Sequence, residues 1–214
     1  MNVRTLARYA GVEALSLVAA AKRYPNLLEP RVHFVYLHSL PSGRELEFER
    51  LVGWIAQTHD LVSYSDAVAL LQGGEDSSRP VACFSTDDAF RSSLRVAEIL
   101  EQYGTRICIF APTDLIGVDS SAAVEAFFGT PEGIEPAVLS WDDLSRLVAR
   151  GHEVGSHTVS HRNLGESPVD VVRSELERSR DVLSERLGQG KHFAWPYGRS
   201  IHACLLYTSD AADE

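Results

Sequence analysis

The residues best suited to chemistry in this chain fall into two short groups. His157 and His161 stand four residues apart, just after an apolar stretch that ends at Gly155, so both imidazoles can point the same way from one turn. Earlier in the chain, the pair Asp87-Asp88 ends another apolar stretch. Two imidazoles and one carboxylate form a metal-binding face with open positions, and the second aspartate stays free beside it as a base. This set predicts metal-assisted hydrolysis.

Composition and charge limit the class of protein. The chain has 214 residues, of which 44% are hydrophobic and 23% are charged, as is typical of one globular domain with a sizeable core. The formal net charge of −10 argues against nucleic acid or an anionic membrane surface as a partner. No apolar run approaches the length of a transmembrane segment. Nothing in the composition indicates the oligomeric state.

The cysteines and the start of the chain bear on its compartment. Cys83 and Cys108 lie inside apolar runs and are interpreted as small buried hydrophobic residues. No pair of cysteines has the spacing of a zinc site. Glu13 interrupts the apolar sequence near the N-terminus, which argues against a signal peptide. A cytoplasmic location is therefore favoured over export.

Apolar runs alternate with helix-period stripes from residue 32 onward, which predicts parallel βα units in an open sheet or a barrel. Strands are predicted at 32–37, 81–85, 105–110, 153–155 and 191–195. Helices are predicted around 48–55, 65–71, 96–103, 122–128, 141–148 and 168–187. Segment 111–137 is otherwise rich in glycine and proline and is predicted to be a long loop, a kind of segment that is often functional.

The residues with chemical potential each follow the carboxyl end of a predicted strand. Asp87-Asp88 follow strand 81–85, His157 and His161 follow strand 153–155, and a Pro-Tyr-Gly turn follows strand 191–195. In βα folds this edge of the sheet holds the active site, so the three motifs are expected to meet there.

Each group also has a plain structural interpretation. Asp87-Asp88 could cap the helix that follows, and His157 and His161 could lie on a surface loop. Pro196-Tyr197-Gly198 is by default a turn. His38 could line the site or simply end its strand.

Three motifs together resemble the polysaccharide deacetylase family over about residues 31–203: Ser85-Thr86-Asp87-Asp88-Ala89, His157-Thr158-Val159-Ser160-His161 and Ala194-Trp195-Pro196-Tyr197-Gly198. The resemblance implies an α/β fold of the irregular (β/α)7 barrel type, incomplete at the C-terminus. It implies that Asp88, His157 and His161 bind a divalent metal, with zinc as the first expectation and cobalt or nickel as alternatives. It also implies that Asp87 is the catalytic base and that the backbone N–H of Tyr197 helps to hold the oxyanion.

Three positions depart from the family pattern. Ala89 stands where the family has glycine, so a turn that requires positive φ would be strained there. Thr86 replaces an aromatic residue, and Trp195 stands where many members have arginine. The later family motifs, one of which supplies the histidine that protonates the leaving group, find no match before Ala203.

The chain is therefore divided into three parts. Residues 1–30 are expected to form an N-terminal helical segment, and residues 31–203 a truncated deacetylase-like domain. Residues 204–214 show no helical or strand period, and their codons can match a sequencing-library adapter. They are interpreted as an artefact, and the natural protein is expected to continue past Ala203.

The expected function is hydrolysis of acetyl groups from an N-acetylated or O-acetylated carbohydrate polymer or oligomer by a metal-dependent enzyme. Because the later motifs are absent, an inactive fragment is also an open alternative. Two further alternatives stay open. The same scaffold could hydrolyse a small non-sugar amide, or the chain could be a degenerate sugar-binding protein without catalysis, as the changes at Thr86 and Ala89 suggest.

Overall fold

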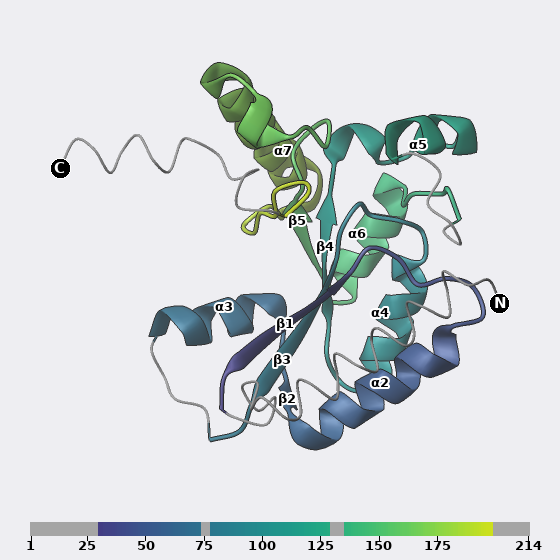
Figure 1. The fold of residues 1–214 in the computed structure, drawn as a ribbon, viewed down its shortest axis with the longest axis vertical. Coiled ribbons are helices and arrows are strands. Elements are labelled where there is room, and N and C mark those ends of the chain that lie inside the picture. The colour runs from purple at the N-terminus through teal and green to yellow at the C-terminus, as the bar shows by residue number, and fades with distance from the viewer. Residues whose placement is uncertain (1–29, 74–77, 129–134, 199–214) are drawn as a thin grey trace, which may run out of the picture.

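The computed structural model describes residues 30–73, 78–128 and 135–198 (Figure 1). The predicted N-terminal helical segment, apart from residue 30, and the predicted artefact at 204–214 lie outside these ranges. Within the described part of the chain, no helix is both long enough and apolar enough to cross a membrane.

A parallel β-sheet organises the described residues. Its strands are β1 (Val32–Leu37), β2 (Asp60–Leu61), β3 (Val81–Thr86), β4 (Ile107–Ala111) and β5 (Glu153–Ser156). They run in the order β1-β3-β4-β5, and β2 pairs with the start of β3. The predicted α/β architecture with a parallel sheet is thus confirmed. β1 and β5 end the sheet, and no strand among the described residues joins them.

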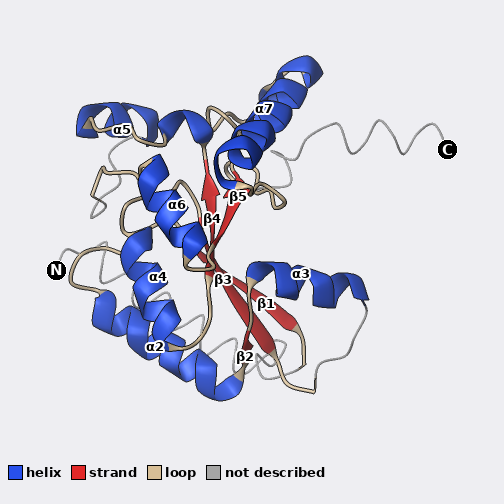
Figure 2. Ribbon diagram, turned by 180° about the vertical axis from the view of Figure 1, so that it is seen from behind, coloured by secondary structure: helices blue, strands red, loops and turns tan. Residues whose placement is uncertain are grey.

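Helices cover the sheet unequally on its two faces. They are α2 (Glu45–Thr58), α3 (Tyr64–Gly73), α4 (Ser93–Gln102), α5 (Ser121–Phe128), α6 (Trp141–Ala149) and α7 (Val169–Leu187), with 3-10 turns η1 (Thr113–Leu115) and η2 (Leu164–Glu166). Helices α2, α4 and α6 lie on one side of the sheet and α3 on the other, as both ribbon views show (Figures 1 and 2). Helices α5 and α7 lie near the carboxyl ends of β4 and β5.

Alternation along the strands separates a packed face from a chemical face. Phe84, Ile109 and Val154 point towards the helix layer and belong to the main hydrophobic core, together with Val52 of α2 and Leu144 of α6. Because side chains alternate along a strand, the residues between them point to the opposite face. That face carries the pocket described below. Burial on both faces explains why β3 and β4 do not alternate between apolar and polar residues.

The ends of two helices follow the sequence signals. Ser140 caps α6: its Oγ accepts from the backbone N–H of Asp143, and the Asp143 carboxylate accepts from the backbone N–H of Ser140. Gly188 ends α7 with a left-handed φ of 63°. Serine and glycine are the residue types preferred at these two helix ends. Pro168 stands just before α7 rather than at its first helical position.

The strand predicted at 191–195 is wrong. Only Phe193 forms a bridge, which is parallel to Ser156. Ser156 is the last residue of β5, and the chain leaves the strand direction at Thr158, whose φ is 67°. Before Ser156, Val154 accepts from the backbone N–H of Gly190 and donates to the Gln189 side chain, so a second bridge does not form there either. The two-residue strand β2 was not predicted, because two residues are too few for an alternating pattern.

Candidate metal centre

The structure brings together three of the side chains that the sequence singles out. Asp88 follows β3, and His157 and His161 follow β5, two strands separated in the sheet by β4. One potential ligand atom from each residue lies within 4.8 Å of the other two. The Nε2 atoms of His157 and His161 lie 3.5 and 3.2 Å from Oδ1 of Asp88. The three groups can therefore face a single cation.

The hydrogen bonds of the site suit a cation at this place. His157 Nδ1 donates to the carbonyl oxygen of Ala194 at 2.8 Å, since a carbonyl can only accept. In the neutral imidazole this leaves a lone pair on Nε2, directed towards Asp88. Oδ1 of Asp88 is buried and makes no hydrogen bond, although both imidazoles approach it. Electron-rich atoms that face one another without a proton are what a divalent cation would satisfy, so the residues fit a metal.

The electrostatics of the three residues agree with this arrangement. Burial alone would raise the pKa of the Asp88 carboxyl, but the adjoining His157 and His161 imidazoles hold that pKa well below its usual range. Burial would lower the pKa of His157, yet Asp88 and Asp87 together raise it. The carboxylate of Asp88 is thus kept in the charged form that a metal ligand requires.

Aromatic rings enclose His161. The rings of Phe127 and Phe128, at the end of α5, lie with centroids 6.0 and 5.2 Å from its imidazole, and the ring of Tyr197 lies at 5.2 Å. Helix α5 belongs to the 111–137 segment that the sequence predicts to be mostly loop. The role of its aromatic pair was not predicted, because nothing in the sequence indicates that a helix remote from the histidine motif covers it.

Backbone strain is concentrated in the site loops. Among the described residues, the non-glycine positions with positive φ are Asp88, Ala89, Thr158, His161 and Tyr197, and all belong to the three motifs. Each such residue costs about 1–3 kcal/mol relative to a relaxed backbone. Ala89 has a φ of 52°, so the chain forms the turn that glycine would form more easily.

The unusual Thr86 has a structural role. Its side chain is fully buried, and its Oγ1 lies 3.0 Å from Oγ of Ser93 at the start of α4. This hydroxyl pair joins the end of β3 to the helix that follows the aspartates. The departure at Thr86 is therefore accommodated within the fold.

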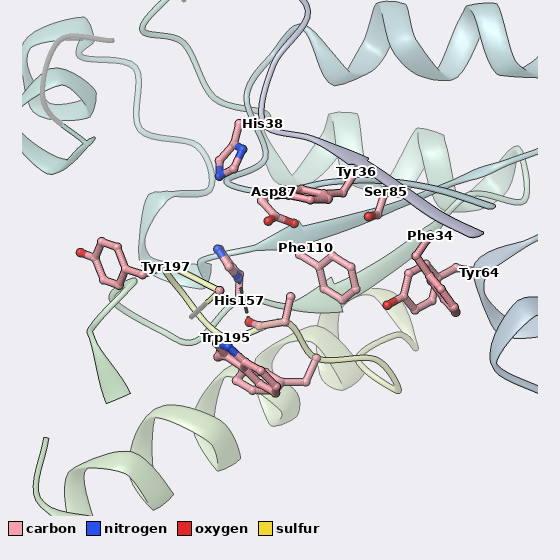
Figure 3. Close-up of a pocket in the computed structure, with 13 residues that line it drawn as sticks. Phe34, Tyr36, His38, Tyr64, Ser85, Asp87, Phe110, His157, Trp195 and Tyr197 are labelled. Atoms are coloured by element: carbon pink, nitrogen blue, oxygen red, sulfur yellow. Dashed lines mark hydrogen bonds between the residues drawn. The ribbon is translucent and has the colours of Figure 1, made fainter. Parts of the chain in front are cut away.

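A pocket opens beside the metal group on the chemical face of the sheet (Figure 3). Asp87 and His38 line it together with His157, and the figure shows these three side chains converging. Asp87 is not part of the metal group. Burial raises the pKa of Asp87, and the nearby His157 and His38 offset only part of that rise.

Aromatic side chains form the remaining walls of the pocket. Phe34 and Tyr36 come from β1, Phe110 from β4, and Trp195 and Tyr197 from the third motif. The Tyr36 and Tyr197 side chains are 65% and 58% exposed, so their faces are open to a ligand. Cys83 and Cys108 are free and buried, as predicted, and burial raises the pKa of the Cys83 thiol to about 12.

Comparison with known proteins agrees with this geometry. A sequence model of the polysaccharide deacetylase family matches residues 75–212, which is more than half of the chain. The chain belongs to the polysaccharide deacetylase family. The matched range contains Asp87, Asp88 and both histidines of the metal group.

Solved structures share the fold of this chain. IcaB from Ammonifex degensii is similar over 84% of this chain and 80% of its own, with a TM-score of 0.65 and 22% identity. The Streptococcus pyogenes deacetylase PplD, solved in complex with acetate, is similar over 80% of this chain and 75% of its own, with a TM-score of 0.60 and 19% identity. At these identities the likeness concerns the fold.

A curated relative matches a shorter part of the chain. The peptidoglycan-N-acetylglucosamine deacetylase of Bacillus cereus is 28% identical over 68 residues, which are 31% of this chain. The match covers only 25% of that relative's length.

Proposed function

We propose that this protein is a metal-dependent hydrolase that removes acetyl groups from an N-acetylated or O-acetylated carbohydrate polymer or oligomer. The observation that carries the proposal is the convergence of Asp88, His157 and His161 beside a pocket that also contains Asp87. Membership of the polysaccharide deacetylase family supports the substrate class.

Asp88, His157 and His161 would hold the metal. A mixed carboxylate and imidazole set suits zinc first, and cobalt or nickel also suit it. When bound, a divalent cation polarises a carbonyl oxygen and lowers the pKa of a water molecule. The hydrogen bond from Nδ1 of His157 to the Ala194 carbonyl would leave Nε2 available to the metal.

Asp87 is the proposed base. Its carboxylate lines the pocket next to the metal group without belonging to it. Because burial raises its pKa, the carboxylate accepts a proton from the attacking water more readily than an exposed aspartate would. The backbone N–H of Tyr197 is the proposed donor to the oxyanion that forms on the acetyl carbon.

The family's leaving-group histidine has no match before Ala203, and within the described residues His38 is proposed to donate the proton to the departing amine instead. It is the pocket histidine that lies outside the metal group, at the end of β1. Figure 3 shows its ring and that of His157 on either side of Asp87. A histidine placed there can protonate the leaving group, while Asp87 accepts a proton from the attacking water.

The domain over residues 31–203 is proposed to belong to an irregular (β/α)7 barrel. The parallel order β1-β3-β4-β5 supports this, and the parallel bridge between Ser156 and Phe193 continues the same pairing direction beyond β5. The exposed aromatic faces of Tyr36 and Trp195 favour a sugar over a small aliphatic amide, because aromatic rings pack against the apolar faces of sugar rings.

Acetate release from N-acetylated chitooligosaccharides tests the function. With zinc or cobalt added, the protein is expected to release acetate, and a chelator is expected to stop it. Asp87→Asn should reduce kcat/KM by about 100-fold or more while metal binding remains. Asp88→Asn should weaken metal binding itself.

Asp181→Asn is the matched control, since Asp181 is a surface residue of α7 that pairs only with Arg180 among the described contacts. It should behave as wild type. Sugar binding without acetate release, at any metal loading, would favour the sugar-binding alternative.

A further inference from the structure

One acidic side chain of α7 binds the loop between the two histidine ligands. Oε2 of Glu175 accepts hydrogen bonds from the backbone N–H of Val159 at 2.8 Å and of Ser160 at 2.9 Å. Its Oε1 accepts from Oγ of Ser160 at 2.7 Å. Hydrogen bonds to a carboxylate are about twice as strong as those between neutral groups. A single side chain thus binds both residues midway between His157 and His161.

A second residue on the same face of α7 binds the start of this loop. Ser179 lies four residues after Glu175, and its Oγ is 2.6 Å from Oγ of Ser156, with both side chains buried. The backbone N–H of Thr158 in turn donates to Oγ of Ser156 at 3.3 Å. Helix α7 therefore contacts the loop at two points along one side.

The loop is under strain and needs such support. Thr158 and His161 have φ values of 67° and 54°. The opposite side of the loop accepts backbone hydrogen bonds, from Thr113 N–H to the Thr158 carbonyl at 3.2 Å and from Asp114 N–H to the Val159 carbonyl at 3.0 Å. The loop N–H groups at Val159 and Ser160 are bound by Glu175. Without it, two N–H donors in the middle of the loop lose their acceptor.

We propose that Glu175 is a positioning residue of the metal centre, which sets the separation and direction of the His157 and His161 imidazoles. It touches neither ligand nitrogen. It acts through the backbone that joins the two ligands, whereas a residue that only stabilised α7 would bond within its own helix. This inference rests on the proposed metal site and adds to it a determinant of metal affinity and geometry.

Metal titration of purified variants tests the inference. Glu175→Ala should weaken zinc and cobalt binding by about 10- to 100-fold, the range found when a group supporting a metal ligand is removed. The visible absorption bands of the cobalt-loaded variant should also shift, because the coordination geometry changes. Glu175→Gln, which keeps the shape and one acceptor oxygen, should bind metal with intermediate affinity.

Glu177→Ala is the matched control. Glu177 lies on the same helix, is 52% exposed and pairs with Arg173 at 3.9 Å. Its variant should keep the metal affinity and cobalt spectrum of wild type. Should Glu175→Ala fail to fold, Glu175→Gln gives the same comparison.

The outcomes separate this inference from the proposed function. If the wild-type protein binds no divalent metal, both proposals are overturned. If wild type binds metal and folded Glu175→Ala binds it equally well with an unchanged cobalt spectrum, only the positioning role is overturned. A lowered melting temperature with unchanged metal binding would assign Glu175 a purely structural role.

Discussion

At the scale of single residues, some groups of the site could be predicted from the sequence and others could not. The grouping of Asp88, His157 and His161 could be predicted, because few other residue types bind metals and the spacing of the histidines suits one turn. The Ala194 carbonyl and the aromatic pair at the end of α5 could not be. Every residue has a backbone carbonyl, so residue type does not reveal which one accepts a hydrogen bond. Phe128 contacts His161 only because the tertiary fold brings them together.

The buried hydroxyl pair allows a prediction at this scale. Thr86→Val keeps the shape of the side chain but leaves the Ser93 hydroxyl without its buried partner. We expect a loss of about 1–3 kcal/mol in the free energy of unfolding, measured by urea denaturation of the metal-free protein. The double variant Thr86→Val with Ser93→Ala should recover much of that loss, since no buried hydroxyl of the pair is then left without a hydrogen-bond partner. Equal losses in the single and double variants would contradict this account.

At the scale of elements, β5 shows how closely the sheet is packed beside the site. A Cβ on Gly155 would lie 2.5 Å from Cε1 of Phe110 and 2.9 Å from the carbonyl oxygen of His192. Neither neighbour can move freely, because Phe110 is buried and the His192 carbonyl accepts from Ser156 N–H. Glycine at this position is therefore required by close approach.

Gly155→Ala is expected to lower the free energy of unfolding by about 1–3 kcal/mol. Phe110 lines the pocket, so its displacement should also lower kcat/KM for acetate release. Adding Phe110→Leu should relieve part of the clash, which a double-mutant cycle in urea would show as favourable coupling. Additive losses would mean that the backbone contact with His192 dominates.

Helices and strands were predicted correctly where the local hydrophobic pattern agrees with the tertiary pairing of the segment. Strand β3 and helix α4 were predictable because an apolar run and a helical stripe follow one another with clear ends. The 191–195 segment has the composition of a strand, but its pairing ends with Ser156. Where a neighbouring strand ends is a property of the assembled sheet, so the local sequence could not reveal it.

At the scale of the whole molecule, an ion cluster connects α4, α6 and β5 near the amino ends of the strands, away from the site. Glu101, at the end of α4, accepts two hydrogen bonds from the Arg150 guanidinium, at 2.9 and 2.7 Å. Its Oε1 also lies 2.9 Å from Nε2 of His152, while Nδ1 of His152 accepts from the backbone N–H of Ile107. The Nε2–H of His152 therefore donates to Glu101. The Arg150 guanidinium, together with His152, lowers the pKa of Glu101 to about 2, against the effect of burial.

This cluster predicts a loss of stability in acid. A carboxylate whose pKa is lower in the folded state stabilises the fold above its unfolded pKa, and that contribution is lost as the pH falls. The difference in unfolding free energy between wild type and Glu101→Gln should therefore be largest above about pH 4.5 and shrink towards pH 2. Urea denaturation across this range measures it. Glu98→Gln, an exposed pair with Arg95, should show a much smaller difference, and a pH-independent difference for Glu101→Gln would contradict the assignment.

The orientation of His157 has a consequence for anyone who mutates this site. The acceptor for its Nδ1–H is the main-chain oxygen of residue 194, so no genetically encoded change of the Ala194 side chain deletes it. A saturation library at that position would therefore miss this contact. Only backbone chemistry, such as an ester in place of the amide that follows residue 194, would weaken the acceptor and expose how much metal affinity depends on it.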